Sequence, residues 1–220
     1  MPHKIFVIEP PFIEPGIPYP DVHRITKVLQ NHGAHADTLD INARMYRQIL
    51  NQIRIEDNND LLINCLKKSF FIDETIESDS SSIIKNLQHE NGKNNITLEK
   101  LLNQSLSLFS DDNIYIDHNH YVNGQECLNG FLDYTVKKID SNSTLWLDHY
   151  ENEVNIHRSQ DVLEYAQNTN NSLRSLYKIY LESEVANWNY DSVLIVIRNQ
   201  TQELPGMVLS AWLKDEYDYH

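Results

Sequence analysis

The sequence predicts an α/β fold, an incomplete flavodoxin-like or Rossmann-like parallel sheet that carries a large helical insertion. Short apolar strands stand near both ends of the chain, at 4–9 and 192–197. The first of them opens a strand–helix–strand series, for which parallel, right-handed pairing is the default. The stretch 50–189 is instead rich in Asn, Ser and Asp, with its apolar positions mostly at helical spacing. We therefore expect one α/β domain, made of 1–49 and 190–220, interrupted by a helical insertion at 50–189.

The first elements have recognisable start and stop signals. Pro10 and Pro11 stop the first strand, because proline cannot donate to a sheet ladder. Asp21 can cap the helix that follows, and Gly33 permits its end. Asp40 precedes apolar residues that recur every fourth position, which is typical of a helix. The expected elements are a strand at 4–9, a helix at about 22–31, a strand at 34–39 and a helix after Asp40.

The end of the chain repeats this strand–turn–helix order. Ser192–Ile197 is a continuous apolar run, which suits a strand covered on both faces. A polar turn then leads into a helix at about 202–216, with Pro205 in its first turn. Three parallel strands leave one edge uncovered, so we expect the insertion, another chain or a missing segment to cover it. Helices are expected near 59–70, 82–90, 97–109, 124–139 and 159–183, with Asn-rich joints at 91–95 and 168–171 and a mobile loop at 73–82.

Composition argues against several classes of protein. The chain has 18 Lys and Arg against 32 Asp and Glu, a net charge of −14, which disfavours binding to a phosphate backbone. No apolar run approaches the roughly 18 residues of a membrane helix, and the N-terminus has the pattern of a strand rather than of a signal peptide. The cysteines, Cys65 and Cys127, are far apart and do not suggest a disulfide. We therefore predict a cytoplasmic protein without nucleic-acid or membrane partners.

Catalytic motifs are equally scarce. The six glycines form neither a phosphate-binding loop nor a Gly-x-Ser-x-Gly motif. Cys65 stands at a helical position among leucines, which favours a buried structural thiol. Asp117, His118 and His120 could ligate a metal, but no further Cys or His stands at a recognisable spacing, so a solvated turn is the preferred interpretation. The sequence alone therefore identifies no catalytic or metal-binding residue.

Topology suggests where a ligand would bind. In open α/β sheets, ligands lie outside the carboxyl ends of the strands, where the crossovers diverge. The loops there include prolines and an aromatic residue after the first strand, and amides and a hydroxyl after the third. Ordinary turns and helix caps remain an equal alternative. The candidate residues in these loops are Pro11, Phe12, Asp40, Asn42, Asn199, Gln200, Thr201 and Gln202.

Four motifs occur in a characteristic order. They are Lys-Ile-Phe-Val-Ile-Glu-Pro-Pro-Phe at 4–12, Val-Leu-Gln-Asn-His-Gly at 28–33, Thr-Leu-Asp-Ile-Asn-Ala-Arg-Met-Tyr at 38–46, and the strand, polar turn and helix of 191–217. This series resembles the N-terminal region of B12-binding-domain radical SAM proteins, particularly those of peptide natural-product maturation. The resemblance covers about 45 residues at the start of the chain and 30 at its end.

The resemblance implies a flavodoxin-like, cobalamin-binding fold with the corrin ring near the carboxyl strand ends. By position, Pro11, Phe12, Asn199, Gln200, Thr201 and Gln202 would line the cofactor loops, and Asp40 and Asn42 would support them. The chain has no Cys-x-x-x-Cys-x-x-Cys motif, so we expect no iron–sulfur cluster on it. The chemistry would then come from a radical SAM partner chain or a missing C-terminal domain.

These observations lead to two functional hypotheses. The first is a cobalamin-binding-like domain or subunit of a B12-dependent radical SAM enzyme in natural-product biosynthesis, not catalytic alone. The second is a non-catalytic interaction or scaffold protein that keeps the fold and binds a partner enzyme or a precursor peptide. Its acidic helical region would then attract a basic partner by charge complementarity.

Overall fold

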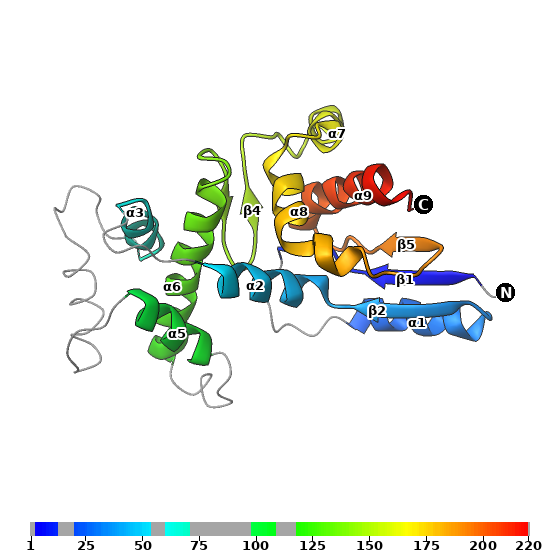
Figure 1. Ribbon diagram of the computed structural model, residues 1–220, viewed down its shortest axis with the longest axis horizontal. Helices are drawn as coiled ribbons and strands as arrows, with labels where there is room; N and C mark the ends of the chain where they lie inside the picture. Colours follow the sequence, from blue (N-terminus) through cyan, green and yellow to red (C-terminus); the bar gives the residue numbers. More distant parts are fainter. Residues whose placement is uncertain (1–2, 13–19, 54–59, 71–97, 109–117, 220) are drawn as a thin grey trace.

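The computed structural model describes residues 3–12, 20–53, 60–70, 98–108 and 118–219, without the side chains of residue 108 and residues 118–120 (Figure 1). It shows a mixed α/β chain with a parallel three-stranded sheet and many helices, so the predicted fold class is confirmed. The strand order is β2–β1–β5. A two-stranded antiparallel hairpin lies apart from this sheet.

The sheet joins the two ends of the chain. Its central strand, β1 (Lys4–Ile8), pairs in parallel with β2 (His35–Leu39) on one side and with β5 (Ser192–Ile195) on the other. The predicted pairing of the first and last strands is therefore confirmed. The chain passes from β1 to β2 on one side and later returns to β5 on the other side of β1. The gap between β1 and β5 is therefore the topological switch point of the sheet.

One helix connects β1 to β2 and another follows β2, and the sequence marks one boundary of each. α1 (Pro20–Asn31) packs against β1 and β2, and Gly33 follows it with φ of +87°, a left-handed conformation that suits glycine. α2 (Ile41–Gln52) begins after Asp40, whose Oδ1 accepts a hydrogen bond from the Ala43 backbone at 2.8 Å. The predicted glycine stop after α1 and the helix start at Asp40 are confirmed. The predicted Asp21 cap is wrong, because α1 already begins at Pro20 and Asp21 lies in its first turn.

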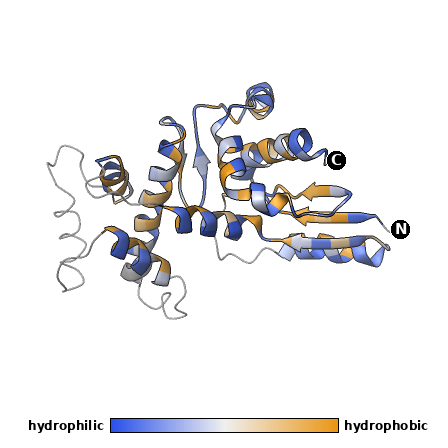
Figure 2. Cartoon of the chain, in the orientation of Figure 1, coloured by the Kyte–Doolittle hydropathy of each residue, from blue (hydrophilic) through white to orange (hydrophobic). Residues whose placement is uncertain are grey.

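The main hydrophobic core lies between the sheet and the helices. Phe6 and Ile8 belong to it, whereas Val7 alternates to the opposite face, which α1 covers. α8 (Ser172–Val185) and α9 (Glu203–Tyr217) pack against each other on the core side, and Tyr177 joins them through a hydrogen bond to the Pro205 carbonyl at 2.9 Å. Figure 2 shows hydrophobic residues concentrated along these inner faces.

Three further helices form a layer beyond α2. α3 (Asp60–Ser69) and α5 (Leu98–Leu108) pack on the long helix α6 (His118–Lys137), as Figure 1 shows. Gly130 permits the close approach of α6 to α3, because a Cβ there would lie 2.7 Å from Leu66 Cδ2 and 2.9 Å from its Cα. One continuous core cluster extends from this layer to the sheet. The proposed division at residues 49 and 190 stays a prediction.

Most of the expected helices are present with small shifts. Those near 59–70, 97–109 and 124–139 are α3, α5 and α6. None of the described helices is long and apolar enough to cross a membrane. The helix expected at 159–183 is two helices, α7 (Ser159–Gln167) and α8, because Asn171 caps α8 by accepting from the Arg174 backbone. The expected helix 82–90, joint 91–95 and loop 73–82 lie outside the described residues.

Two short features differ from the sequence-based expectation. The strand expected at 192–197 ends at Ile195, and a 3₁₀ turn, η2 (Gln200–Gln202), precedes α9. The hairpin of β3 (Thr144–Leu145) and β4 (Tyr150–Glu151) was not predicted. Its strands have two residues each, too few to produce a period-2 pattern in the sequence.

Candidate functional site

The switch point between β1 and β5 is filled by the protein's own polar side chains. Glu9, after β1, is buried, and its Oε1 accepts hydrogen bonds from Arg198 Nε at 2.7 Å and from Arg198 Nη2. Gln202 is fully buried; its Nε2 donates to Glu9 Oε1 at 3.1 Å and to the Pro10 carbonyl at 3.3 Å. Its Oε1 accepts from the Arg198 backbone at 3.0 Å. We call Glu9, Arg198 and Gln202 the strand-end network.

The turn after β1 directs its aromatic residue into the core. Phe12 has φ of +74° and is completely buried, and its backbone N–H donates to Asn42 Oδ1 at 2.8 Å. Its ring lies 5.7 Å from that of Tyr150 and 6.1 Å from that of Tyr46, measured between centroids. Pro11 is buried as well. Three of the predicted site residues, Pro11, Phe12 and Asn42, thus anchor the turn to α2 and the core.

The other predicted residues, apart from the buried Gln202, are exposed. Asn199, Gln200 and Thr201 form the η2 turn, in which Asn199 Oδ1 accepts from Thr201 Oγ1 at 2.7 Å and from the Gln202 backbone at 3.2 Å. Asp40 is exposed and caps α2. The structure therefore brings the two predicted loops, after β1 and after β5, to one edge of the sheet, while leaving only part of their side chains accessible.

A cleft opens beside the η2 turn. Its volume is about 350 Å³, and it separates η2 and the start of α9 from the β3–β4 hairpin. We call it the hairpin cleft. Sequence reasoning identified Gln200 and Thr201 but missed the hairpin side of the cleft. Those residues stand in the insertion, between the helices expected at 124–139 and 159–183. The lining residues are Asp148, His149, Tyr150, Glu151, Ile156, Gln200, Thr201 and Leu204.

His149 is the central polar group of the hairpin cleft. Its Nδ1 lies 2.6 Å from Asp148 Oδ1, and its Nε2 lies 3.5 Å from Glu151 Oε1. The hydrogen bond to Asp148 raises the pKa of His149 despite partial burial, and the same bond lowers the pKa of Asp148. Both shifts favour an imidazolium–carboxylate pair. Such a pair can bind polar groups or exchange a proton with them.

A buried hydroxyl network holds the hairpin in place. Tyr150 OH lies 2.7 Å from both Ser143 Oγ and Ser172 Oγ, and both serines donate to Asp140 Oδ2, at 2.6 and 3.0 Å. Burial raises the pKa of Tyr150, so it stays a neutral phenol. Burial alone would also raise the pKa of Asp140, but the serine hydrogen bonds hold it below its usual range. The network therefore positions one wall of the hairpin cleft.

A serine, a histidine and an aspartate meet at the opposite end of the sheet. His3 Nε2 lies 2.9 Å from Ser192 Oγ, and His3 Nδ1 lies 3.5 Å from Asp191 Oδ2. This is the order of groups in a nucleophile–base–carboxylate triad. However, the side chains of His3 and Asp191 are 58% and 54% exposed, so water competes for both partners and nothing fixes the imidazole. We assign these residues no catalytic role.

The cysteines and the proposed metal motif offer no site either. Cys65 and Cys127 are free and buried, and burial raises the pKa of each thiol to about 12, so both are unreactive near neutral pH. Among the described residues, no group of three His, Cys, Asp or Glu side chains could hold a metal ion. Asp117 and the side chains of His118 and His120 lie outside the described part of the structure.

Comparisons with known proteins do not identify the chain. No family model matches it, and neither curated proteins nor solved structures give a significant match. The family resemblance therefore stays a prediction from the sequence motifs. What the structure adds is the convergence of the predicted loops at one sheet edge, next to an acidic, histidine-containing cleft.

Proposed function

We propose that the chain is a B12-binding-type α/β module that acts with a radical SAM chain in peptide or natural-product modification, and that it is not catalytic alone. The observation that carries the proposal is the parallel order β2–β1–β5, with the η2 turn at the switch point. It places the two loops that carry the family-like motifs together. Cytoplasmic location, without nucleic-acid or membrane partners, is part of the proposal, and the net charge of −14 disfavours a nucleic-acid partner.

Cobalamin would contact this edge of the sheet through the exposed η2 turn. The corrin ring carries peripheral amide groups, and Asn199, Gln200 and Thr201 offer exposed amides and a hydroxyl to them. The strand-end network fills the crevice itself, so the ring would rest on the η2 turn and the mouth of the hairpin cleft rather than between β1 and β5. A bound cobalamin would supply alkyl transfer, and the iron–sulfur cluster would belong to the partner.

Titration with hydroxocobalamin tests the cofactor part of the proposal. Hydroxocobalamin should show a saturable change in its visible spectrum when the purified chain is added. The Gln200→Ala/Thr201→Ala double variant should bind it about tenfold more weakly, the loss of affinity expected from about two neutral hydrogen bonds. Gln104→Ala, an exposed substitution on α5, is the matched control. No spectral change in the unaltered chain, or an equal response of all three proteins, would rule out cobalamin at this site.

A scaffold protein that has lost the cofactor is the second candidate. The strand-end network favours it, because Glu9, Arg198 and Gln202 satisfy one another where a ligand would enter. Such a protein would bind a radical SAM enzyme or a precursor peptide without cobalamin. Co-purification with a co-expressed radical SAM protein, in medium free of cobalamin, would support this candidate; a strict requirement for added cobalamin would contradict it.

A further inference from the structure

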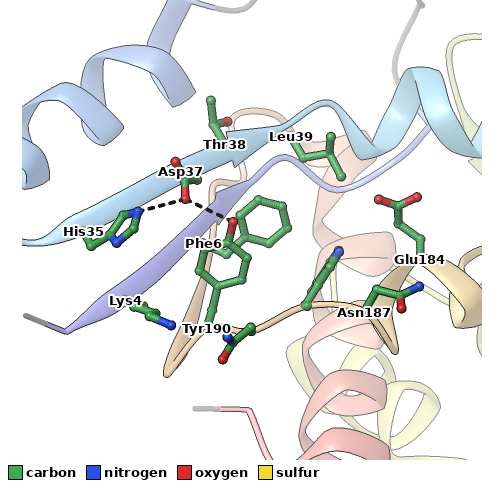
Figure 3. A pocket seen from close by; sticks show the side chains of 11 residues that line it. Lys4, Phe6, His35, Asp37, Thr38, Leu39, Glu184, Asn187 and Tyr190 are labelled. Atoms are coloured by element: carbon green, nitrogen blue, oxygen red, sulfur yellow. Dashed lines mark hydrogen bonds and ion pairs between the residues drawn. The ribbon is translucent and has the colours of Figure 1, made fainter. Parts of the chain in front are cut away.

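A second cleft lies on the core-side face of the sheet. It has a volume of about 400 Å³ and lies between the strands β1 and β2 and the segment that joins α8 to β5 (Figure 3). We call it the sheet-face cleft. None of the residues predicted for the strand ends belongs to it. It is lined by Lys4, Phe6, His35, Asp37, Thr38, Leu39, Glu184, Asn187, Trp188, Asn189 and Tyr190.

Three aromatic rings form one wall of this cleft. Tyr190 stacks on Phe6 with a centroid separation of 4.4 Å and an interplanar angle of 5°, and Trp188 meets Phe6 edge-on at 4.6 Å. Phe6 is buried in β1, so the two other rings are held against a fixed base. The faces of such rings carry negative electrostatic potential and attract cations.

Two carboxylates flank the rings, and each has one unused oxygen. Asp37 Oδ2 accepts from Tyr190 OH at 3.1 Å, and Glu184 Oε1 accepts from Arg44. Within the described chain, no hydrogen bond or ion pair involves Asp37 Oδ1 or Glu184 Oε2. Figure 3 shows the Phe6 and Tyr190 rings between these two acidic side chains.

An amide adds a further acceptor near Glu184. Asn187 Nδ2 donates to the Ser183 carbonyl at 2.7 Å, and its Oδ1 has no partner within the described residues. The cationic side chains of the cleft, Lys4 and His35, lie toward the starts of β1 and β2, where His35 Nε2 is 3.5 Å from Asp37 Oδ2 (Figure 3). Trp188 Nε1 is a buried neutral donor of the lining without a hydrogen-bond partner in the described chain. At the end formed by Glu184 and Asn187, Glu184 Oε2 and Asn187 Oδ1 are acceptors without a partner in the described chain, and a ligand with several N–H donors would match them.

We propose that the sheet-face cleft binds an organic cation, a protonated amine or guanidinium group, between the carboxylates of Asp37 and Glu184 and against the aromatic wall. The guanidinium of Arg44 on Glu184 is an internal example of this recognition. The net charge of −14 would attract a cationic ligand from a distance. The cation comes either from a free small molecule or from a basic side chain of a peptide. This proposal does not depend on cobalamin.

Calorimetric titration of the full chain with agmatine tests the proposal. We expect binding of one agmatine per chain, weakened by added salt, and no binding of uncharged pentan-1-ol. Asp37→Asn and Glu184→Gln should each weaken binding about tenfold, the loss expected for one charge-assisted hydrogen bond. Glu99→Gln, which removes an exposed carboxylate on α5 outside both clefts, should leave it unchanged.

Two further arms make the result decisive. An arginine-containing peptide with blocked ends that binds at least as tightly as agmatine identifies a peptide side chain as the ligand, and preference for agmatine identifies a small molecule. Thermal unfolding of each variant shows that the fold is retained. Absence of agmatine binding at millimolar concentration, or an equal loss in Glu99→Gln and Asp37→Asn, would overturn the assignment.

Discussion

The strand-end network and the sheet-face cleft use charged side chains in opposite ways. At the strand ends, Oε1 of the buried Glu9 accepts hydrogen bonds from Arg198 and Gln202, so the carboxylate charge is paired within the protein. On the sheet face, Asp37 and Glu184 each keep one oxygen without a described partner, beside an open volume of about 400 Å³. The first arrangement stabilises the fold, whereas the second leaves binding capacity unused.

The difference shows that the position of a ligand site in the fold does not decide whether its hydrogen-bonding groups are available to a ligand. Fold topology identifies the carboxyl edge as the place where α/β sheets bind ligands, and the predicted loops do meet there. Availability depends on individual hydrogen-bond partners, which topology does not specify. A substitution in the strand-end network should therefore act mainly on stability, and one in the sheet-face cleft mainly on binding.

The largest effect is expected from Arg198→Met. It leaves the Glu9 carboxylate, 8% exposed, without its charged partner, and breaking such a pair costs about 3 kcal/mol of unfolding free energy. Denaturant unfolding measures this loss. The double variant Glu9→Gln/Arg198→Met should recover about half of it, because the uncompensated charge is gone. Equal stability of the parent and Arg198→Met would show that the network is not structural.

A smaller effect concerns Asp133, a buried carboxylate on α6. It is 1% exposed, and the side chains of Cys65 and Thr144 are its hydrogen-bonding neighbours. Burial raises its pKa, with Lys137 at 3.8 Å and Lys68 opposing the shift. The protonated form therefore stabilises the fold below the usual Asp pKa, and this contribution is lost as pH rises through the raised value.

Asp133→Asn should remove this pH dependence. Relative to the parent, the variant should gain on the order of 1 kcal/mol of unfolding free energy between pH 4 and pH 7, because it has no charge to bury. Urea unfolding at both pH values gives the comparison. A difference that stays constant with pH, or changes in the opposite direction, would contradict the raised pKa. Unlike Asp37, this residue lines neither of the two clefts, so its burial affects stability and not ligand binding.

The smallest effect on stability is expected from Asp37→Asn. The Asp37 side chain is 48% exposed, and substitutions at such positions usually change the unfolding free energy by less than about 0.5 kcal/mol. The same denaturant series used for Arg198→Met measures it. Tyr190→Phe, which keeps the ring stack and removes the hydroxyl bonded to Asp37, is the matched control. A loss above about 2 kcal/mol would mean that Asp37 belongs to the folding framework.

The backbone framework was largely readable from the sequence. The strands at both ends, the glycine after α1 and the Asp40 cap have strong local signals, and each is confirmed. The division between α7 and α8 was suggested by the asparagines at 168–171, and Asn171 provides the cap. The β3–β4 hairpin has no such signal, because Leu145 and Tyr150 stand in strands of two residues whose burial comes from tertiary packing.

The candidate site was less predictable, for a physical reason. Sequence position placed Phe12, Asn42 and Gln202 at the correct edge but could not show that their side chains turn inward. That outcome depends on the positive φ of Phe12 and on the bonds of Gln202 to Glu9 and Pro10, which join distant parts of the chain. The sheet-face cleft was missed altogether, because Asp37 and Glu184 come together only through the tertiary fold.

The central position of β1 has a consequence for how the protein folds. One edge of β1 pairs with β2, which follows soon in the chain, whereas the other edge pairs with β5, which comes much later. Lys4 and Asp191, which form a hydrogen bond at this junction, are 187 positions apart. Closing so long a loop is slow, and synthesis of the intervening segment takes time. On the ribosome, β1 therefore keeps an open edge until Ser192–Ile195 has been made. The nascent protein depends on its helices, or on a chaperone, to shield that edge from other chains.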